Sequence, residues 1–164
     1  MILPKDKKDM QEKKLEKFEL TREQIREIAT ELNLGMRVFM NMETKEIISV
    51  FNFLDKPDES TEGWEYVLDE LKKNAHKYFE FTKMSSGRSF KVMEEFVENL
   101  DNEELQEKLY EALSGEKVFR KFKDIIEAEY VYKNKWFSFK NSHNSVWIRE
   151  QLSNYFKKKE LEND

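Results

Sequence analysis

Apolar side chains recur three and four residues apart along most of this chain. That spacing places them on one face of an amphipathic helix, which is the face that such a helix buries. The clearest case is the segment 118–126, whose apolar face consists of Phe119, Phe122, Ile125 and Ile126. The same spacing predicts further helices between residues 21 and 35, 61 and 75, 88 and 100, and 101 and 115.

Local signals indicate where the first of these helices begins and ends. Thr21 and Gln24 have the spacing of a capping box, in which each side chain accepts a hydrogen bond from the backbone of the other residue. Leu20 and Ile25 have the spacing of a hydrophobic staple around this cap. Gly35 is well placed to end the helix, because glycine adopts a positive φ without a Cβ penalty.

Two further N-caps are predicted at Thr61 and Asp101, each just before an apolar helical pattern. A last helix is expected to begin near Asn134 or near Ser145 and to run to Lys159. The polar stretch 141–145 is expected to break this helix in two, because it interrupts the apolar pattern.

Alternating apolar and polar residues predict three strands, at residues 36–42, 47–53 and 78–82. The polar turn 43–46 joins the first two strands as a β-hairpin. The first strand carries a methionine-rich face, which we expect to pack against helices. An adaptable binding surface is the alternative for these methionines.

These elements predict an α+β fold that is mostly helical, with a small antiparallel sheet of about three strands. The chain has 164 residues with only 4 Gly and 2 Pro, which favours long helices over a fold with many turns. Its length predicts one domain over residues 20–159. A charged N-terminal arm or helix precedes it at residues 1–19, and a frayed tail follows at 160–164.

Charge is distributed unevenly along the chain, although the net charge is only −5. Residues 54–111 carry 16 acidic and 8 basic side chains, whereas residues 117–159 carry 4 acidic and 11 basic ones. The two regions either face each other or are ordinary solvated surfaces. A sharper hypothesis is that the basic third meets nucleic acid or an acidic partner.

The basic third contains the candidate interaction surface of this protein. Its cations are Arg120, Lys121, Lys123, Lys133, Lys135 and Lys140. Aromatic residues stand among them, so nucleic-acid bases could stack on exposed rings while the lysines contact phosphate. The core spacing of Phe119 and Phe122 and the overall negative charge count against this hypothesis.

A second, weaker candidate is an anion site at Ser86, Gly87, Arg88 and Lys91. Backbone N–H groups at the start of a helix can hold a phosphate, and two cations lie nearby. An ordinary helix start explains the same residues equally well.

No catalytic constellation is visible in the sequence. Cysteine is absent, which excludes thiolate catalysis and cysteine-ligated metals. His76 and His143 each stand alone, without a second histidine four residues away. Phosphate loops, dinucleotide fingerprints and nucleophile elbows are absent as well, so we expect no cofactor and no metal.

Several ordered segments resemble one protein family. Three of these segments are Leu113-Ser114-Gly115, Phe119-Arg120-Lys121-Phe122-Lys123-Asp124 and Trp136-Phe137-Ser138-Phe139. Two more come earlier in the chain: parts of a helix pair at 93–105 and a hairpin at 41–47. Together they are similar to a bacterial family catalogued only as uncharacterised protein family 0158, over roughly residues 20–152. Lys45 stands where that family usually has a hairpin glycine, and a late tryptophan is replaced around Gln151, with Trp147 earlier.

The resemblance implies a compact intracellular bacterial protein and no established activity. We therefore expect a non-enzymatic binding or regulatory module that acts through contacts with an unidentified protein. The alternative is a nucleic-acid-associated protein, and an enzyme built on the many carboxylates is a third hypothesis. No secretory signal and no membrane-spanning segment is apparent, which predicts a cytoplasmic location. The oligomeric state stays open.

Overall fold

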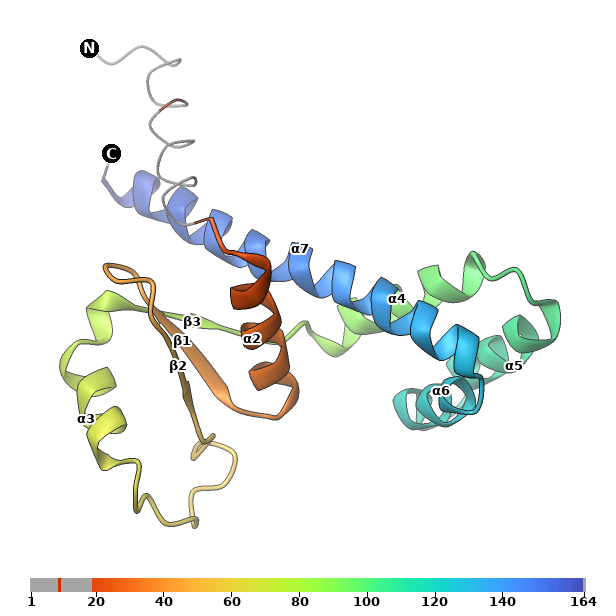
Figure 1. The fold of residues 1–164 in the computed structure, drawn as a ribbon, viewed down its shortest axis with the longest axis horizontal. Coiled ribbons are helices and arrows are strands. Elements are labelled where there is room, and N and C mark those ends of the chain that lie inside the picture. The colour runs from red at the N-terminus through yellow and green to blue at the C-terminus, as the bar shows by residue number, and fades with distance from the viewer. Residues whose placement is uncertain (1–8, 10–18, 164) are drawn as a thin grey trace. The chain divides into compact units, whose positions relative to one another are not determined.

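The computed structural model describes Asp9 and residues 19–163 (Figure 1). The arm predicted at residues 1–19 therefore falls almost entirely outside the described residues. The elements are α2 (Arg22–Asn33), β1 (Arg37–Asn41), β2 (Ile47–Val50), α3 (Glu65–Lys73), the 3-10 helix η1 (Ala75–Lys77), β3 (Tyr78–Phe81), α4 (Ser86–Glu98), α5 (Glu103–Ser114), α6 (Val118–Glu127) and α7 (Tyr130–Glu162). The predicted α+β class, with a three-stranded antiparallel sheet, is confirmed.

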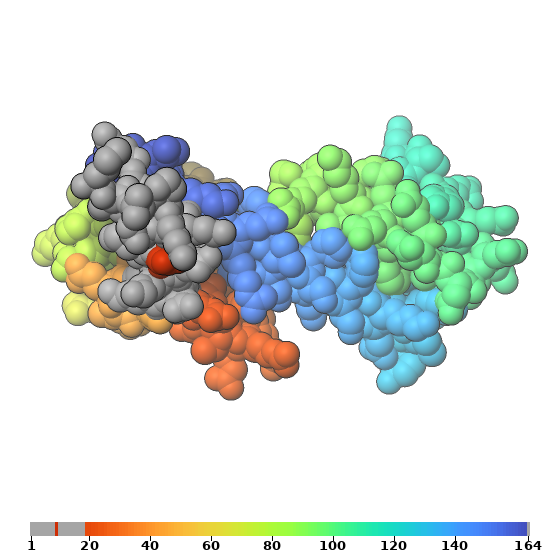
Figure 2. All heavy atoms as spheres, turned by 90° about the horizontal axis from the view of Figure 1, so that it is seen from above, coloured from red at the N-terminus to blue at the C-terminus, as the bar shows by residue number. Residues whose placement is uncertain are grey.

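The chain forms two compact units. The sheet unit consists of the described residues up to Lys83 together with those from Ser145 to Asn163. The helical unit is residues 84–144, the green to light-blue spheres in Figure 2. That residues 20–159 behave as one domain stays a prediction.

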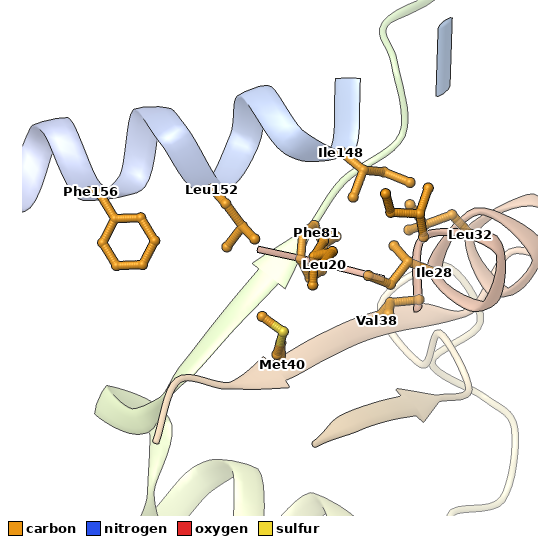
Figure 3. Close-up of a cluster of buried hydrophobic side chains, with 10 residues drawn as sticks. Leu20, Ile28, Leu32, Val38, Met40, Phe81, Ile148, Leu152 and Phe156 are labelled. Carbon is orange, nitrogen blue, oxygen red and sulfur yellow. The ribbon is translucent and has the colours of Figure 1, made fainter. Parts of the chain in front are cut away.

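The sheet unit is built on strand order β2-β1-β3, with β1 antiparallel to both neighbours. Val38 of β1 pairs with Ser49 on one side and with Phe81 on the other. Figure 3 shows the resulting core, whose labelled residues come from the sheet, α2, the second half of α7 and the residue before the N-cap of α2: Leu20, Ile28, Leu32, Val38, Met40, Phe81, Ile148, Leu152 and Phe156. The methionine-rich face of β1 therefore packs against helices, as expected.

Two hairpin details differ from a simple alternating pattern. β2 ends at Val50, short of the predicted end at residue 53. Lys45 in the turn has a φ of +65°, a left-handed conformation that costs a residue with a Cβ about 1–2 kcal/mol. The glycine that the resembling family has at this position would not bear that cost.

The start of α2 follows the sequence prediction. Thr21 Oγ1 accepts a hydrogen bond from Gln24 N at 3.1 Å, and Gln24 Oε1 accepts one from Thr21 N at 2.9 Å. Leu20 and Ile25 are both buried in the core cluster, as a hydrophobic staple requires. Gly35 follows the helix with a φ of +83°. The capping box and the glycine end are therefore confirmed.

The other two predicted N-caps are wrong. The N-cap residue of α3 is Trp64, not Thr61, and its side chain makes no capping bond. The chain turns through Gly63 with a φ of +85°, so the helix cannot begin earlier. In α5 the cap is Asn102, whose Oδ1 accepts from Leu105 N at 3.1 Å. Asp101 instead accepts a hydrogen bond from Tyr132 Oη at 3.0 Å.

The core of the helical unit is separate and rich in aromatic rings. Trp136 of α7 lies at its centre, with ring centroids 4.9 Å from Phe122 of α6 and 5.1 Å from Phe96 of α4. The predicted burial of Phe119 is wrong, because this side chain is 49% exposed. Val118 packs against the core at the start of α6 instead.

The predicted break of the last helix is also wrong. α7 is continuous from Tyr130 to Glu162, and it begins earlier than either expected start. The stretch 141–145 contains neither proline nor glycine, and Ser142 Oγ donates a hydrogen bond to the backbone oxygen of Ser138. The buried residues shift to another face after this stretch, since Trp136 and Leu152 stand 16 positions apart. In a helix of 3.6 residues per turn, two side chains 16 positions apart point in directions that differ by about 160°, so they do not belong to one apolar stripe. Residues 160–162 are helical, and their fraying stays a prediction.

Replacing Thr21 with alanine is expected to destabilise the protein by about 1 kcal/mol, because Gln24 N loses its acceptor. Thr61 is the matched control. Its side chain caps no helix, so Thr61→Ala should change stability by less than about 0.5 kcal/mol. Urea melts followed by circular dichroism measure both values. Equal losses in the two variants would contradict the assignment of the caps.

Candidate interaction surface

The three predicted cations of α6 are exposed but point in different directions. Lys123 Nζ lies 3.9 Å from Glu127 Oε1 on its own helix. Lys121 lines a groove of about 370 Å³ between α5 and α6, together with Lys108, Glu111 and Asp124. Arg120 stands between them, about 100° around the helix from Lys121.

The three predicted cations of α7 are also divided. Lys133 Nζ lies 5.7 Å from the ring centroid of Phe137. Lys135 Nζ lies 3.8 Å from Asp101 Oδ2 and 5.1 Å from the Tyr132 ring centroid. Lys133 and Lys135 point to opposite sides, because residues two apart in a helix differ by about 200°. Lys140 is half-buried.

The structure therefore sorts these cations into two groups. Lys121 and Lys135 are turned toward α5 and the Asp101 that precedes it. Lys123 and Lys133 lie on the other side of their helices. The six cations do not converge on one continuous surface.

The second group lies among exposed aromatic rings. The exposed fractions are 49% for Phe119, 45% for Phe137 and 79% for Tyr130. Phe119 and Lys123 share one side of α6, and Tyr130, Lys133 and Phe137 share one side of α7, by their three- and four-residue spacing. The Phe122 ring of α6 packs on the Trp136 ring of α7, and these two residues directly precede Lys123 and Phe137 in the chain. We name Phe119, Lys123, Tyr130, Lys133 and Phe137 the aromatic–basic face.

This face combines apolar area with positive charge. Rings that are 45–79% exposed can be covered by a partner, and Lys133 beside Phe137 can pair with a carboxylate or phosphate. Trp136 is 8% exposed and Phe139 is half-buried, so neither ring is free to stack on a ligand. The sequence predicted the lysines of the face, but it assigned Phe119 to the core.

The candidate anion site lies in the first turns of α4. Ser85 is the N-cap, and its Oγ accepts a hydrogen bond from Arg88 N at 3.1 Å. Ser86, Gly87 and Lys91 are exposed, and the position of a Cβ on Gly87 meets no atom within 4 Å. Arg88 is half-buried. The residues are thus adjacent, as helix geometry requires, and an anion there stays a prediction.

The sheet unit has a cleft of about 220 Å³ beside β1 and β3. Arg37 and Glu80 form a bidentate pair on its wall, with both N–O distances 2.8 Å. The hydrogen bond from Arg37 to Glu80 raises the pKa of the guanidinium above its ordinary value, so Arg37 keeps its positive charge. The Arg37 guanidinium and the Glu80 carboxylate therefore each have a partner of opposite charge within the cleft.

One histidine–carboxylate pair has no sequence signal. His143 Nε2 of α7 lies 3.6 Å from Glu95 Oε2 of α4, and its ring packs on Phe139. The 48 positions that separate these residues in the chain hide the pair from any local pattern. His76 is exposed in η1. Among the described residues, no group of three or more histidine, aspartate or glutamate side chains is arranged to hold a metal ion.

Within the described part of the chain, every helix is too short or too polar to cross a bilayer. A family model described as Uncharacterised protein family (UPF0158) matches residues 39–163. This match begins and ends later than the resemblance over residues 20–152. No curated protein and no solved structure matches the chain.

Proposed function

Since this chain belongs to an uncharacterised protein family, UPF0158, we propose from its surface that it is a non-enzymatic binding module that acts through protein contacts. The proposed contact site is the aromatic–basic face of α6 and α7. The bacterial cytoplasm, the location expected from the sequence, is part of the same proposal.

The observation that carries the proposal is the exposure of three aromatic rings on two helices that pack together. Phe119, Tyr130 and Phe137 leave much of their ring area in water, although each aromatic side chain can bury about 150–250 Å². Aromatic side chains are enriched in protein interfaces and supply much of their binding energy. Lys123 and Lys133 beside these rings favour a partner that carries carboxylates.

Charge favours a protein over nucleic acid as the partner. A nucleic-acid surface needs cations that follow the phosphate backbone, whereas Lys121 and Lys135 lie on another side of their helices, near Asp124 and Asp101. A protein partner can match such a mixture of charges. Lys133 beside the exposed Phe137 ring also suits a stacked base and its phosphate, so nucleic acid is the alternative.

A comparison of co-purified proteins tests the proposal. The tagged protein and its Phe119→Ala/Phe137→Ala variant are expressed in the native host, cross-linked and purified, and the co-purified proteins are quantified. We expect a specific partner whose recovery falls by at least about tenfold in the variant, since central aromatic contacts are worth about 2 kcal/mol or more. Thermal melts confirm that the variant is folded.

The matched control is Leu34→Ala/Leu161→Ala, which removes two exposed apolar side chains from the sheet unit. Unchanged recovery with the face variant, or equal loss with the control, would refute the assignment to this face. Fluorescence anisotropy with labelled oligonucleotides is the parallel measurement. Micromolar binding that persists at physiological salt and is lost in the face variant would replace a protein by nucleic acid as the ligand.

A further inference from the structure

We propose that the partner of the aromatic–basic face is a second copy of this chain, which contributes residues 54–70. This inference rests on the proposed function and identifies the partner. Residues 54–70, named here the acidic segment, comprise the loop after β2 and the first part of α3. They contain seven acidic residues and one lysine.

The acidic segment presents charge that the described protein does not neutralise. Asp58, Glu59 and Glu62 are exposed and form no ion pair with any described residue. Other acids of the segment have internal partners, as when Asp69 Oδ2 pairs with Lys73 Nζ at 2.8 Å. The unpaired carboxylates are therefore concentrated at the loop end of the segment.

The same segment also presents apolar side chains to water. Tyr66 is 85% exposed and Leu54 is 73% exposed. α3 has an apolar stripe, yet none of its residues is fully buried. A surface in which exposed apolar side chains lie among carboxylates is the complement of rings that lie among lysines.

Charge along the chain supports this pairing. Residues 117–140 contain seven basic and three acidic residues, opposite in sign to the acidic segment. Each copy carries both the aromatic–basic face and the acidic segment. A closed two-fold dimer would therefore form the contact twice, with the segment of each copy on the face of the other.

Sedimentation equilibrium over a range of protein concentrations tests the proposal directly. At about 0.1 M NaCl we expect a species of twice the 20.0 kDa monomer mass. At about 1 M NaCl the dissociation constant should rise by at least about tenfold, because the screening length falls from about 10 Å to about 3 Å.

Charge reversal makes the test specific. Lys123→Glu/Lys133→Glu makes the face acidic, and Asp58→Lys/Glu62→Lys makes the segment less acidic. Each variant alone should dissociate at least about tenfold more readily than the parent protein. An equimolar mixture should dimerise again, because the two introduced lysines can pair with the two introduced glutamates in one contact, and the other contact joins the unchanged face to the unchanged segment. Arg22→Glu/Arg26→Glu is the control, since it makes the same charge change on exposed positions of α2 and should leave the dimer intact.

Three results would overturn the inference. They are a monomer at every concentration, a dimer that is insensitive to both charge reversals, and charge-reversed variants that do not dimerise when mixed. A monomer would also be the result if the segment bound the face of its own copy. Failure here is separable from failure of the proposed function: a monomeric protein that loses a co-purified partner on Phe119→Ala/Phe137→Ala still has a binding face, with a different occupant.

Discussion

Replacing Trp136 with alanine is expected to destabilise the protein by about 3–5 kcal/mol. The side chain is 8% exposed and lies between Phe96 and Phe122, with ring centroids 5.1 and 4.9 Å away. Its removal would leave a cavity bordered by α4, α6 and α7, and the remaining rings could fill it only in part. Urea melts followed by far-UV circular dichroism measure the loss.

Phe119→Ala is the control within the same unit. Phe119 is 49% exposed, so its truncation should cost less than about 1 kcal/mol. A loss below about 1 kcal/mol for Trp136→Ala would mean that the ring is not part of the core. A loss above about 3 kcal/mol for Phe119→Ala would remove this residue from the aromatic–basic face and return it to the buried stripe.

Phe81→Ala should have an effect of similar size, about 3–5 kcal/mol, on the sheet unit. Phe81 is 1% exposed, pairs with Val38 across the sheet and packs in the core with Ile148 and Leu152. Tryptophan fluorescence offers a nearby reporter, because Trp147 Nε1 donates a hydrogen bond to the backbone oxygen of Thr82 at 2.8 Å.

Tyr66→Ala is the control for the sheet unit, since Tyr66 is 85% exposed and should change stability by less than about 0.5 kcal/mol. The Phe81 and Trp136 variants together test whether residues 20–159 form one domain. A single domain predicts that either variant shifts the same transition for all probes. In the Trp136→Ala variant both remaining tryptophans, Trp64 and Trp147, belong to the sheet unit. Separate transitions for tryptophan fluorescence and for far-UV circular dichroism in that variant would show two domains.

Much of the fold was predictable because its signals are local. The capping box at Thr21 and Gln24 depends on residues three positions apart, and the hairpin depends on alternation along two short strands. The family resemblance also indicated the turn position of Lys45, where the backbone adopts a positive φ. Such features need no knowledge of distant parts of the chain.

The errors arose where distant contacts decide the outcome. Asp101 and Asn102 are both good N-cap residues, and the choice depends on Tyr132, which donates a hydrogen bond to Asp101. The burial of Phe119 could not be separated from that of Phe122, because the core contacts of α6 are made by other helices. α7 has no continuous apolar stripe, so its two halves read as two helices with a polar break.

The candidate site was also predictable only in part: local sequence identified its residues, and the packing of distant elements decided their directions. Sequence composition located the basic and aromatic residues, but their directions follow only when residues 130–144 are known to be helical. Lys133 and Lys135 then lie on opposite sides, and only Lys133 remains beside an exposed ring. His143 and Glu95 meet solely because α4 and α7 pack within the helical unit.

The order of the two units along the chain has a consequence for synthesis. The helical unit is one uninterrupted stretch, whereas the sheet unit is completed by Ile148, Leu152 and Phe156, which a ribosome releases after that stretch. At about 5–20 residues per second, residues 84–144 take roughly 3–12 s to translate. Throughout that interval α2 is already made, but Val38 and Met40 of the nascent hairpin lack the part of their core that α7 supplies. A chaperone that binds exposed apolar strands would therefore find its target during translation, and a pause in translation within residues 84–144 would prolong this exposure.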